Sequence, residues 1–116
     1  MTVVLPPLGL YHPPTDAIEL PAVLHALSDP QRLQILRLLD AQKTPVPCGS
    51  LPLGISKSTA THHFRVLREA GLIEQSPTGT SKLTTLRRAD IDARFPGLLE
   101  LVLTYPRELS DAASGA

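Results

Sequence analysis

The segment ISKSTATHHFRVLREAGLIEQS, residues 55–76, decides the fold of this chain of 116 residues. Ser56 is a favourable N-cap, because its hydroxyl can accept a hydrogen bond from a free backbone N–H two or three residues later. Gly71 suits the left-handed position that ends a helix, so the helix is expected to stop there. One buried helix face is predicted from apolar residues at spacings i, i+4 and i+7, namely Ala60, Phe64 and Leu67.

The other side of this predicted helix carries short hydroxyl residues near its start and longer basic residues behind them. Short side chains let a helix approach base edges in DNA, whereas Lys and Arg reach the phosphates. The free N–H groups and the positive dipole end at the helix start also favour a phosphate. Arg68 is expected off the buried face as well. The predicted DNA surface on the helix is Ser56, Lys57, Ser58, Thr61, His62 and Arg65.

A β-hairpin is predicted directly after the helix. Strands are expected at 72–76 and 81–86, joined by a turn at 77–80 in which a glycine supplies a positive φ. Arg87 and Arg88 after the second strand would place donors where a wing could touch the DNA backbone, although ordinary surface cations are the simpler interpretation of the hairpin alone. The wing residues added to the predicted DNA surface are Gly79, Thr80 and Lys82.

Charge is distributed unevenly along the chain. The 11 Lys and Arg residues balance 11 Asp and Glu residues, and the pI is about 6.9. Between residues 57 and 88, however, six basic residues stand against two acidic ones, so this segment carries +4 and the remainder −4. Positive charge confined to one part of a neutral chain is typical of a nucleic-acid surface.

Three motifs together resemble the ArsR/SmtB family. They are SDPQRLQILRLL at 28–39, the pattern S-x-S-x-x-x-H-H-F-x-x-L-x-x-A-G-L-I at 56–73, and the Gly-Thr pair at 79–80. Members of this family are prokaryotic winged-helix repressors, typically dimeric, that leave their operator when a metal ion or another signal is sensed. The resemblance covers roughly residues 17–104. It implies a sequence-specific DNA-binding regulator.

The predicted fold is mainly α-helical with a small β-hairpin wing, a winged helix-turn-helix. Residues 1–15 are expected to form an irregular proline-rich arm, 16–104 the DNA-binding and dimerisation domain, and 105–116 a flexible tail. Before the segment 55–76 the sequence predicts a helix at 16–28 capped by Asp16 and a helix from Pro30 capped by Asp29. A loop at 44–47 and a short helix at 48–54 are expected to follow them. After the hairpin, a C-terminal helix is expected to reach about residue 104 and to start or kink at Pro96.

The C-terminal helix predicts a homodimer. Its apolar residues leave almost no polar side, which is unusual for a surface helix of a small monomer; they are Leu98, Leu99, Leu101, Val102 and Leu103. Pairing of this helix and the first helix across a two-fold axis would present two recognition helices to successive major grooves about 34 Å apart. The operator is therefore expected to be an imperfect palindrome of double-stranded DNA.

The sequence leaves the effector unknown. Its single cysteine, Cys48, excludes two-cysteine redox sensing within one chain. A divalent transition metal held by Cys48 with His12 or His25, within or across a dimer, is one candidate; a small buried packing residue is the simpler interpretation of Cys48. The adjacent His62 and His63 point about 100° apart on a helix, so they are assigned to DNA contact and to a structural role, respectively.

Other function classes are less well supported. The chain has no phosphate-cradling glycine loop and no evident pair of catalytic carboxylates, so no enzymatic activity is expected. The alternative function is a winged-helix module that binds another protein and not DNA. The expected compartment is the cytoplasm, and no membrane partner is expected, because signal-peptide and transmembrane patterns are lacking.

Overall fold

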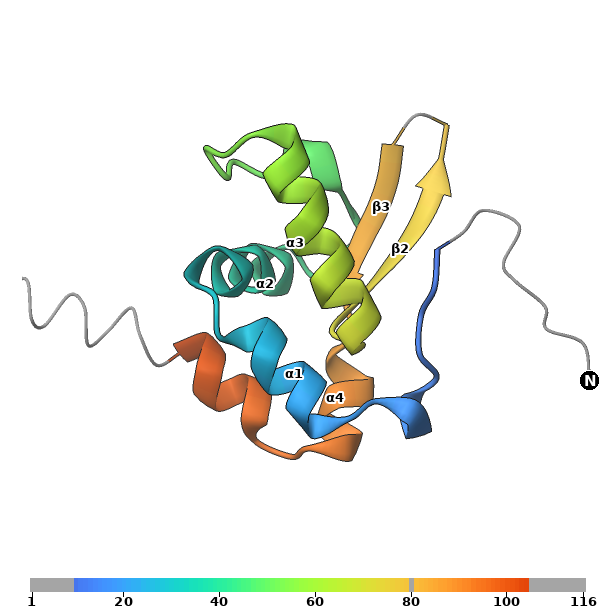
Figure 1. Cartoon of the computed structure of the whole chain (residues 1–116), viewed down its shortest axis with the longest axis vertical. Coiled ribbons are helices and arrows are strands. Elements are labelled where there is room, and N and C mark those ends of the chain that lie inside the picture. The colour runs from blue at the N-terminus through green and yellow to red at the C-terminus, as the bar shows by residue number, and fades with distance from the viewer. Residues whose placement is uncertain (1–9, 80, 105–116) are drawn as a thin grey trace, which may run out of the picture.

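The computed structural model describes residues 10–79 and 81–104 (Figure 1). The elements in chain order are a 3-10 turn η1 (Thr15–Ala17), α1 (Leu20–Leu27), α2 (Pro30–Gln42), β1 (Val46–Pro47), a 3-10 turn η2 (Cys48–Ser50), α3 (Lys57–Ala70), β2 (Ile73–Thr78), β3 (Ser81–Leu86) and α4 (Arg88–Arg94). Residues 98–104 are also helical. This architecture confirms the predicted mainly helical class with a β-hairpin wing.

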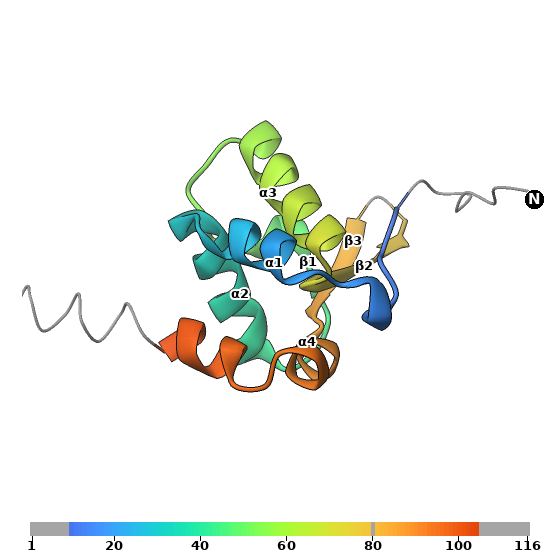
Figure 2. The same ribbon diagram turned by 60° about the horizontal axis from the view of Figure 1, so that its bottom comes forward.

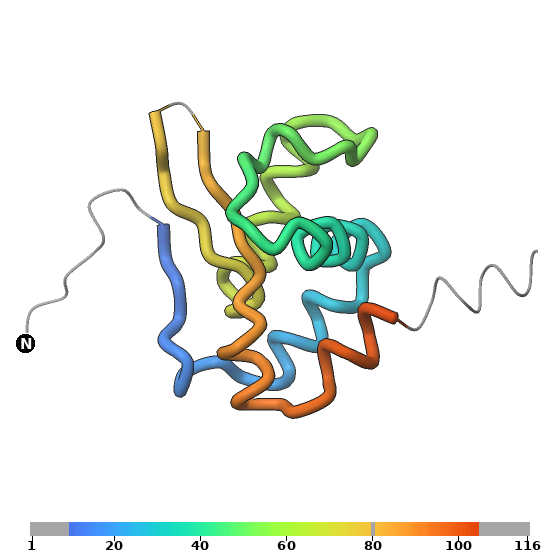
Figure 3. Tube along the Cα trace, turned by 180° about the vertical axis from the view of Figure 1, so that it is seen from behind, coloured from blue at the N-terminus to red at the C-terminus, as the bar shows by residue number. Residues whose placement is uncertain are grey.

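The recognition helix and the hairpin share one end of the molecule. Figure 1 shows the first turn of α3 and the tip of the β2–β3 hairpin at this end, with α4 and the C-terminal helical segment at the other. The view from behind shows the same arrangement (Figure 3). In Figure 2, α1 and α2 lie between α3 and the C-terminal helical segment. The helices therefore form a base that supports α3 and the wing.

The predicted ends of α3 are confirmed by its hydrogen bonds. At the start, Ser56 Oγ accepts from the Thr59 N–H at 3.2 Å. At the end, Gly71 has φ 94°, and the Leu72 N–H donates to the Leu67 carbonyl at 3.0 Å. This pattern is the Schellman motif, which satisfies the last carbonyls of a helix. Both ends of α3 are thus decided by residues within the segment itself.

Gly71 also brings α3 close to the chain before α1. A Cβ built on Gly71 would lie 2.6 Å from Ile18 Cγ1, and Ile18 is fully buried. A side chain at position 71 would therefore require Ile18 to shift.

The sheet is larger than the predicted hairpin. It has three antiparallel strands in the order β1-β3-β2, so the expected loop at 44–47 supplies a short strand, β1, which pairs with β3. The strand β3 has the predicted bounds, while β2 runs on through Pro77 to Thr78, and the predicted four-residue turn is wrong. Because β2 is an edge strand, the missing N–H of a proline costs the sheet no ladder bond.

Two predicted helices are shorter than expected because prolines and a glycine interrupt them. A helix from residue 16 would place Pro21 in its interior, where proline clashes with the preceding turn; α1 begins instead at Leu20, with Pro21 in its first turn, and Asp16 caps no α-helix. At 48–54 only the turn η2 forms. Pro52 and Gly54, which has φ 69°, prevent the predicted short helix.

Asp29 caps α2 as predicted. Its carboxylate accepts from the N–H groups of Gln31 at 2.7 Å and Arg32 at 3.3 Å. Burial acts to raise the pKa of Asp29, but the N–H groups of Arg32 and Gln31 and the nearby charges of His63 and Arg32 lower it by more, so the pKa lies below its ordinary value. The ionised carboxylate is therefore the form that stabilises the fold.

Replacing Asp29 by alanine is expected to lower the free energy of unfolding by about 1 kcal/mol near neutral pH, the usual contribution of an N-cap. Asp29→Asn keeps an acceptor and should lose less. Because the folded pKa lies below the unfolded value of about 3.9, the contribution of the charge is present above that pH and is lost as the pH falls through the folded pKa. Thermal unfolding between neutral and acidic pH should show the gap between wild type and Asp29→Asn closing; a pH-independent gap would contradict this.

The C-terminal region changes direction at Pro96, as predicted. Helix α4 ends at Arg94, Gly97 has φ 86°, and helical structure resumes at 98–104. Leu99 and Leu103 are buried in the core, whereas Leu101 is 62% exposed. Residues 1–9, Thr80 and the predicted tail at 105–116 lie outside the described residues.

Candidate nucleic-acid interface

All six predicted DNA-contacting residues of α3 are exposed. His63, Phe64 and Leu67 on the opposite side are buried. The helix therefore separates a polar face from a core face as its sequence pattern predicts. The exposed set is Ser56, Lys57, Ser58, Thr61, His62 and Arg65.

The hydroxyl groups of the first turn are linked to one another. Ser56 Oγ donates to Thr59 Oγ1 at 2.8 Å and lies 3.3 Å from Ser58 Oγ. Thr61 Oγ1 donates to the Lys57 carbonyl at 2.9 Å. Thr59, which the sequence prediction omitted, is exposed on the same turn. The hydroxyls of Ser56, Thr59 and Thr61 therefore hold the shape of this turn, and their contacts to a ligand must accommodate these bonds.

The start of α3 offers free backbone donors. The N–H groups of Lys57 and Ser58 precede the first helical hydrogen bond, which the Ala60 N–H makes to the Ser56 carbonyl at 2.9 Å. Such groups, together with the helix dipole, favour an anion. The Lys57 ammonium stands on the same exposed turn. This end of α3 suits a phosphate group.

The two adjacent histidines occupy different environments. His62 is exposed, whereas His63 is 7% exposed and its Nδ1 lies 3.3 Å from Arg32 Nη1. The structure thus gives His63 the buried structural position that the sequence predicted. His62 remains available to a ligand.

Arg32 is a positioning residue that the sequence analysis missed. It is buried, its Nε donates to the Ala26 carbonyl at 2.7 Å, and its Nη2 donates to the His25 carbonyl at 3.1 Å. These bonds cap the last carbonyls of α1, while the contact with His63 reaches α3. Arg32 therefore joins three helices and fixes the orientation of the recognition helix. The sequence gives one indication of this role: Arg32 follows the helix cap Asp29 by three residues and so lies in the first turn of α2.

The wing carries fewer predicted DNA contacts than the helix. Gly79 is exposed at the hairpin tip with φ 59°, and Lys82 is half-buried on β3 opposite Pro77. The third predicted wing residue, Thr80, lies outside the described residues. The hairpin stands beside α3 (Figure 1), so both elements face the same side of the molecule.

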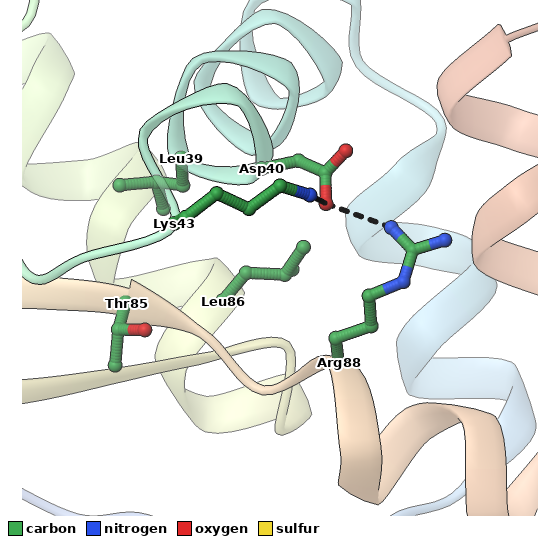
Figure 4. Close-up of a pocket in the computed structure, with 6 residues that line it drawn as sticks. All are labelled: Leu39, Asp40, Lys43, Thr85, Leu86 and Arg88. Carbon is green, nitrogen blue, oxygen red and sulfur yellow. Dashed lines mark hydrogen bonds and ion pairs between the residues drawn. The ribbon is translucent and has the colours of Figure 1, made fainter.

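Arg87 and Arg88, the two arginines after the second strand of the wing, are bonded within the fold. Arg87 donates to Asp90 Oδ2 at 2.9 Å and to the Pro13 carbonyl at 2.8 Å. Arg88 pairs with Asp40 at 2.7 Å, beside Leu86, as Figure 4 shows. Both arginines therefore hold the fold together and do not approach the hairpin tip.

Arg88 connects three helical elements. Besides Asp40 on α2, it lies 3.7 Å from Asp92 on α4 and 2.9 Å from Glu100 in the C-terminal helical segment. The positive charge of Arg88, which the charge count of residues 57–88 included, is thus neutralised by carboxylates that lie elsewhere in the chain, Asp40 and Glu100.

Arg68 is also misassigned by the sequence. It is 7% exposed, and its Nη1 donates to Gln75 Oε1 at 2.8 Å. Gln75 Nε2 in turn donates to Thr84 Oγ1 at 3.2 Å. Burial lowers the pKa of Arg68, the nearby Glu69 raises it, and the charge of Arg65 lowers it again. The basic residues left on the exposed face of α3 and on the wing are Lys57, Arg65 and Lys82.

The three residues that the sequence offered as metal ligands, His12, His25 and Cys48, do not form a common site in the described residues. His12 Nε2 accepts a hydrogen bond from the Gln75 N–H at 2.9 Å, which fastens the arm to the free edge of β2. Burial lowers the pKa of His12, so the neutral ring that this bond needs is favoured. His25 is exposed on α1 and Cys48 is half-buried in η2. Over residues 10–79 and 81–104, no group of three or more His, Cys, Asp or Glu side chains is placed to hold a metal ion.

None of the helices in the described ranges combines the length and the apolar character that crossing a membrane requires.

Comparisons with known proteins agree with this architecture. The sequence pattern described as "Helix-turn-helix domain" matches residues 27–76. The chain is 38% identical over 80 residues to the uncharacterized HTH-type transcriptional regulator YceK of Bacillus subtilis (strain 168), covering 67% of this chain and 80% of that protein. It is 34% identical over 70 residues to the HTH-type transcriptional regulator NmtR of Mycobacterium tuberculosis, covering 60% of this chain and 58% of that protein.

Solved structures show the same fold. An ArsR-like transcriptional regulator from Rhodococcus sp. RHA1 superposes with a TM-score of 0.57 at 25% identity, over 82% of this chain and 87% of that one. M. tuberculosis Rv0081 superposes with a TM-score of 0.54 at 28% identity, over 78% of this chain and 88% of that one. With a capped recognition helix beside a β-wing, the chain belongs to the ArsR family of winged helix-turn-helix transcriptional regulators, which are DNA-binding proteins and not enzymes.

Proposed function

We propose that this regulator is a homodimeric repressor of a prokaryotic operon, binds an imperfect palindromic operator, and is released or modulated by a metal ion or another small signal. The observation that carries the proposal is the exposed polar face of α3, which ends in free N–H groups and is free of intramolecular ion pairs in the described residues. As a regulator of chromosomal DNA it would act in the cytoplasm. The proposed contact residues are Ser56, Lys57, Ser58, Thr61, His62, Arg65, Gly79, Thr80 and Lys82.

We assign the reading of bases and the contact with phosphates to different residues according to side-chain length. The residues of the first turn of α3 are short enough to bring the helix close to base edges, so they are proposed to read sequence. Lys57, Arg65 and Lys82 are proposed to contact phosphates, because long cations reach the backbone and carry little sequence information.

Removing the phosphate-contacting cations is expected to weaken DNA binding and to flatten its salt dependence. Lys57→Gln and Arg65→Gln should each reduce the slope of log K against log salt by about 1, since each lost phosphate contact releases about one counterion fewer. Lys43→Gln removes an exposed charge just after the end of α2 and serves as the control. Binding to a random duplex at low salt, followed by fluorescence anisotropy, measures the effect.

The outcomes of this experiment separate the two functions that the sequence left open. A DNA-binding protein must bind the random duplex at low salt, and the two α3 variants must bind it more weakly than Lys43→Gln does. No binding by the wild type would support the alternative, a winged-helix module that binds another protein. Equal binding by all variants would show that the DNA surface lies elsewhere.

The proposed dimer is supported by leucines that the described part of one protomer leaves uncovered. Leu20 and Leu24, one turn apart on α1, are 41% and 49% exposed, and Leu101 is 62% exposed. Three exposed leucines on two helices favour burial against a partner. A two-fold axis through this surface would place two copies of α3 for half-sites about 34 Å apart.

The proposed signal is open to direct measurement. Divalent transition metals added to the protein–DNA complex should release the DNA if a metal is the signal, and the same series with Cys48→Ala shows whether the thiol takes part. A small molecule of another kind is indicated if neither protein responds.

A further inference from the structure

A small pocket lies between the recognition helix and the sheet. Its volume is about 100 Å3, and it opens between α3 and the strands of the wing. A pocket of this size admits a few water-sized groups, which suits a single phosphate or sulfate group and not a nucleotide. The polar side chains that line it are Cys48, Thr61, Arg65, Arg68, Gln75 and Lys82.

The pocket wall is strongly positive. Three of its side chains, Arg65, Arg68 and Lys82, are basic, and no acidic side chain lines it. None of the three forms an ion pair with a residue in the described ranges. Three cations around one small space repel one another, and an anion placed between them would offset this repulsion.

Arg68 gives the pocket a buried and incompletely bonded donor. Its side chain is more than nine-tenths buried, and Gln75 Oε1 accepts from its Nη1. The buried Nε of Arg68 finds no hydrogen-bond acceptor among the described residues. A buried guanidinium without a direct ion pair is costly, and an unsatisfied N–H adds to that cost. Both costs fall if an oxyanion enters the pocket.

Two neutral side chains of the wall have already used protons that would face an anion. Thr61 Oγ1 donates to the Lys57 carbonyl, and Gln75 Nε2 donates to Thr84 Oγ1. One N–H of Gln75 and the weak thiol donor of Cys48 remain beside the charged groups. The strongest donors left for a ligand are the charged groups, so the pocket favours an anion over a neutral polar molecule.

We infer that this pocket binds one tetrahedral oxyanion of the phosphate or sulfate type, held by Arg68 from below and by Arg65 and Lys82 from the rim. The oxyanion has two sources, a backbone phosphate of bound DNA or a free anion in solution. The first source rests on the proposed function, because it requires DNA to lie across α3 and the wing. The second source stands without it.

Cys48 makes the pocket measurable. It is the single cysteine of the chain and it lines the pocket, so alkylation of the thiol reports on this place alone. Iodoacetate is an anion and iodoacetamide is neutral. The rate of alkylation by iodoacetate divided by the rate by iodoacetamide should be higher for Cys48 than for a free thiol such as N-acetylcysteine, because the cations attract the anionic reagent. The same ratio should fall in the variant Arg65→Gln/Lys82→Gln.

The test is protection of Cys48 from iodoacetamide at constant ionic strength. Inorganic phosphate or a random duplex, each added at about ten times its Kd, should slow alkylation of the wild type about tenfold. The control variant Lys43→Gln changes a residue outside both the pocket and the proposed DNA surface and should be protected as the wild type is. The double variant Arg65→Gln/Lys82→Gln and the variant Arg68→Gln should both lose protection. The double variant changes only exposed or half-buried residues at the rim, so it still tests the pocket if Arg68→Gln does not fold.

Each outcome has one meaning. Protection by phosphate identifies a free oxyanion as a ligand, and protection by duplex alone identifies the DNA backbone; both support the pocket. Absence of protection by either overturns it. Protection by saturating duplex that persists in Arg65→Gln/Lys82→Gln, without protection by phosphate, also overturns it, because DNA then only covers the thiol. Duplex binding is followed by anisotropy on the same samples, so loss of the proposed function is seen separately from loss of the pocket.

Discussion

Replacing Leu101 by glutamate is expected to separate the homodimer into monomers and to weaken binding to a palindromic operator by about 10²–10⁴-fold, the usual gain from joining two binding modules. Leu101 is the most exposed leucine of the described residues. Burying a leucine contributes about 1.5–3 kcal/mol, and a two-fold interface would lose this contribution twice. A glutamate there would also bring two like charges into an apolar surface.

Sedimentation equilibrium at micromolar concentration measures the first effect, and titration of an operator selected from genomic fragments measures the second. Ala41→Glu places the same charge at an exposed position near the end of α2 and should leave both unchanged. Thermal unfolding of each variant shows whether the monomer remains folded. A wild type that is already monomeric, or a dimeric Leu101→Glu, would exclude the proposed interface.

Gly71→Ala is expected to lower the free energy of unfolding by about 2–4 kcal/mol, because two costs add at this position. The residue has φ 94°, which a side chain disfavours, and the new Cβ would lie 2.6 Å from the buried Ile18. Since a domain is stable by only about 5–15 kcal/mol, this one methyl group would remove a large part of its stability.

Gly54→Ala separates the two costs. Gly54 has φ 69° but nothing within 4 Å of its added Cβ, so only the backbone cost of about 1–2 kcal/mol applies. Chemical denaturation of both variants should place Gly71→Ala well below Gly54→Ala. Equal losses would show that Ile18 moves aside without cost.

The structure follows the sequence most closely where the deciding contacts are local. Ser56, Gly71 and the apolar spacing between them define α3 completely, and Asp29 with Pro30 starts α2, because each signal acts within four residues of the bond it makes. The bounds of β3 were likewise predicted from its own sequence pattern. These elements carry the six helix residues of the proposed DNA surface.

The predictions fail where a residue's partner is distant. Arg68 was expected off the buried face from its place in the helix, yet it is buried and bonded to Gln75 on β2. The loop expected at 44–47 joins the sheet because β3, far later in the chain, offers it an open edge. A helical period shows only which residues share a side, not which neighbouring element covers them.

Local sequence therefore decided the class of the fold, the recognition helix and the exposed face that carries its polar residues. Only the tertiary structure decided which charges remain free. Arg87 and Arg88 pair with carboxylates, of which Asp40 and Glu100 are distant in the chain, whereas Arg68 enters the core without an ion pair among the described residues. The reason is that a helix end depends on residues within one turn, whereas a counter-charge is brought to a cation by the packing of the whole chain.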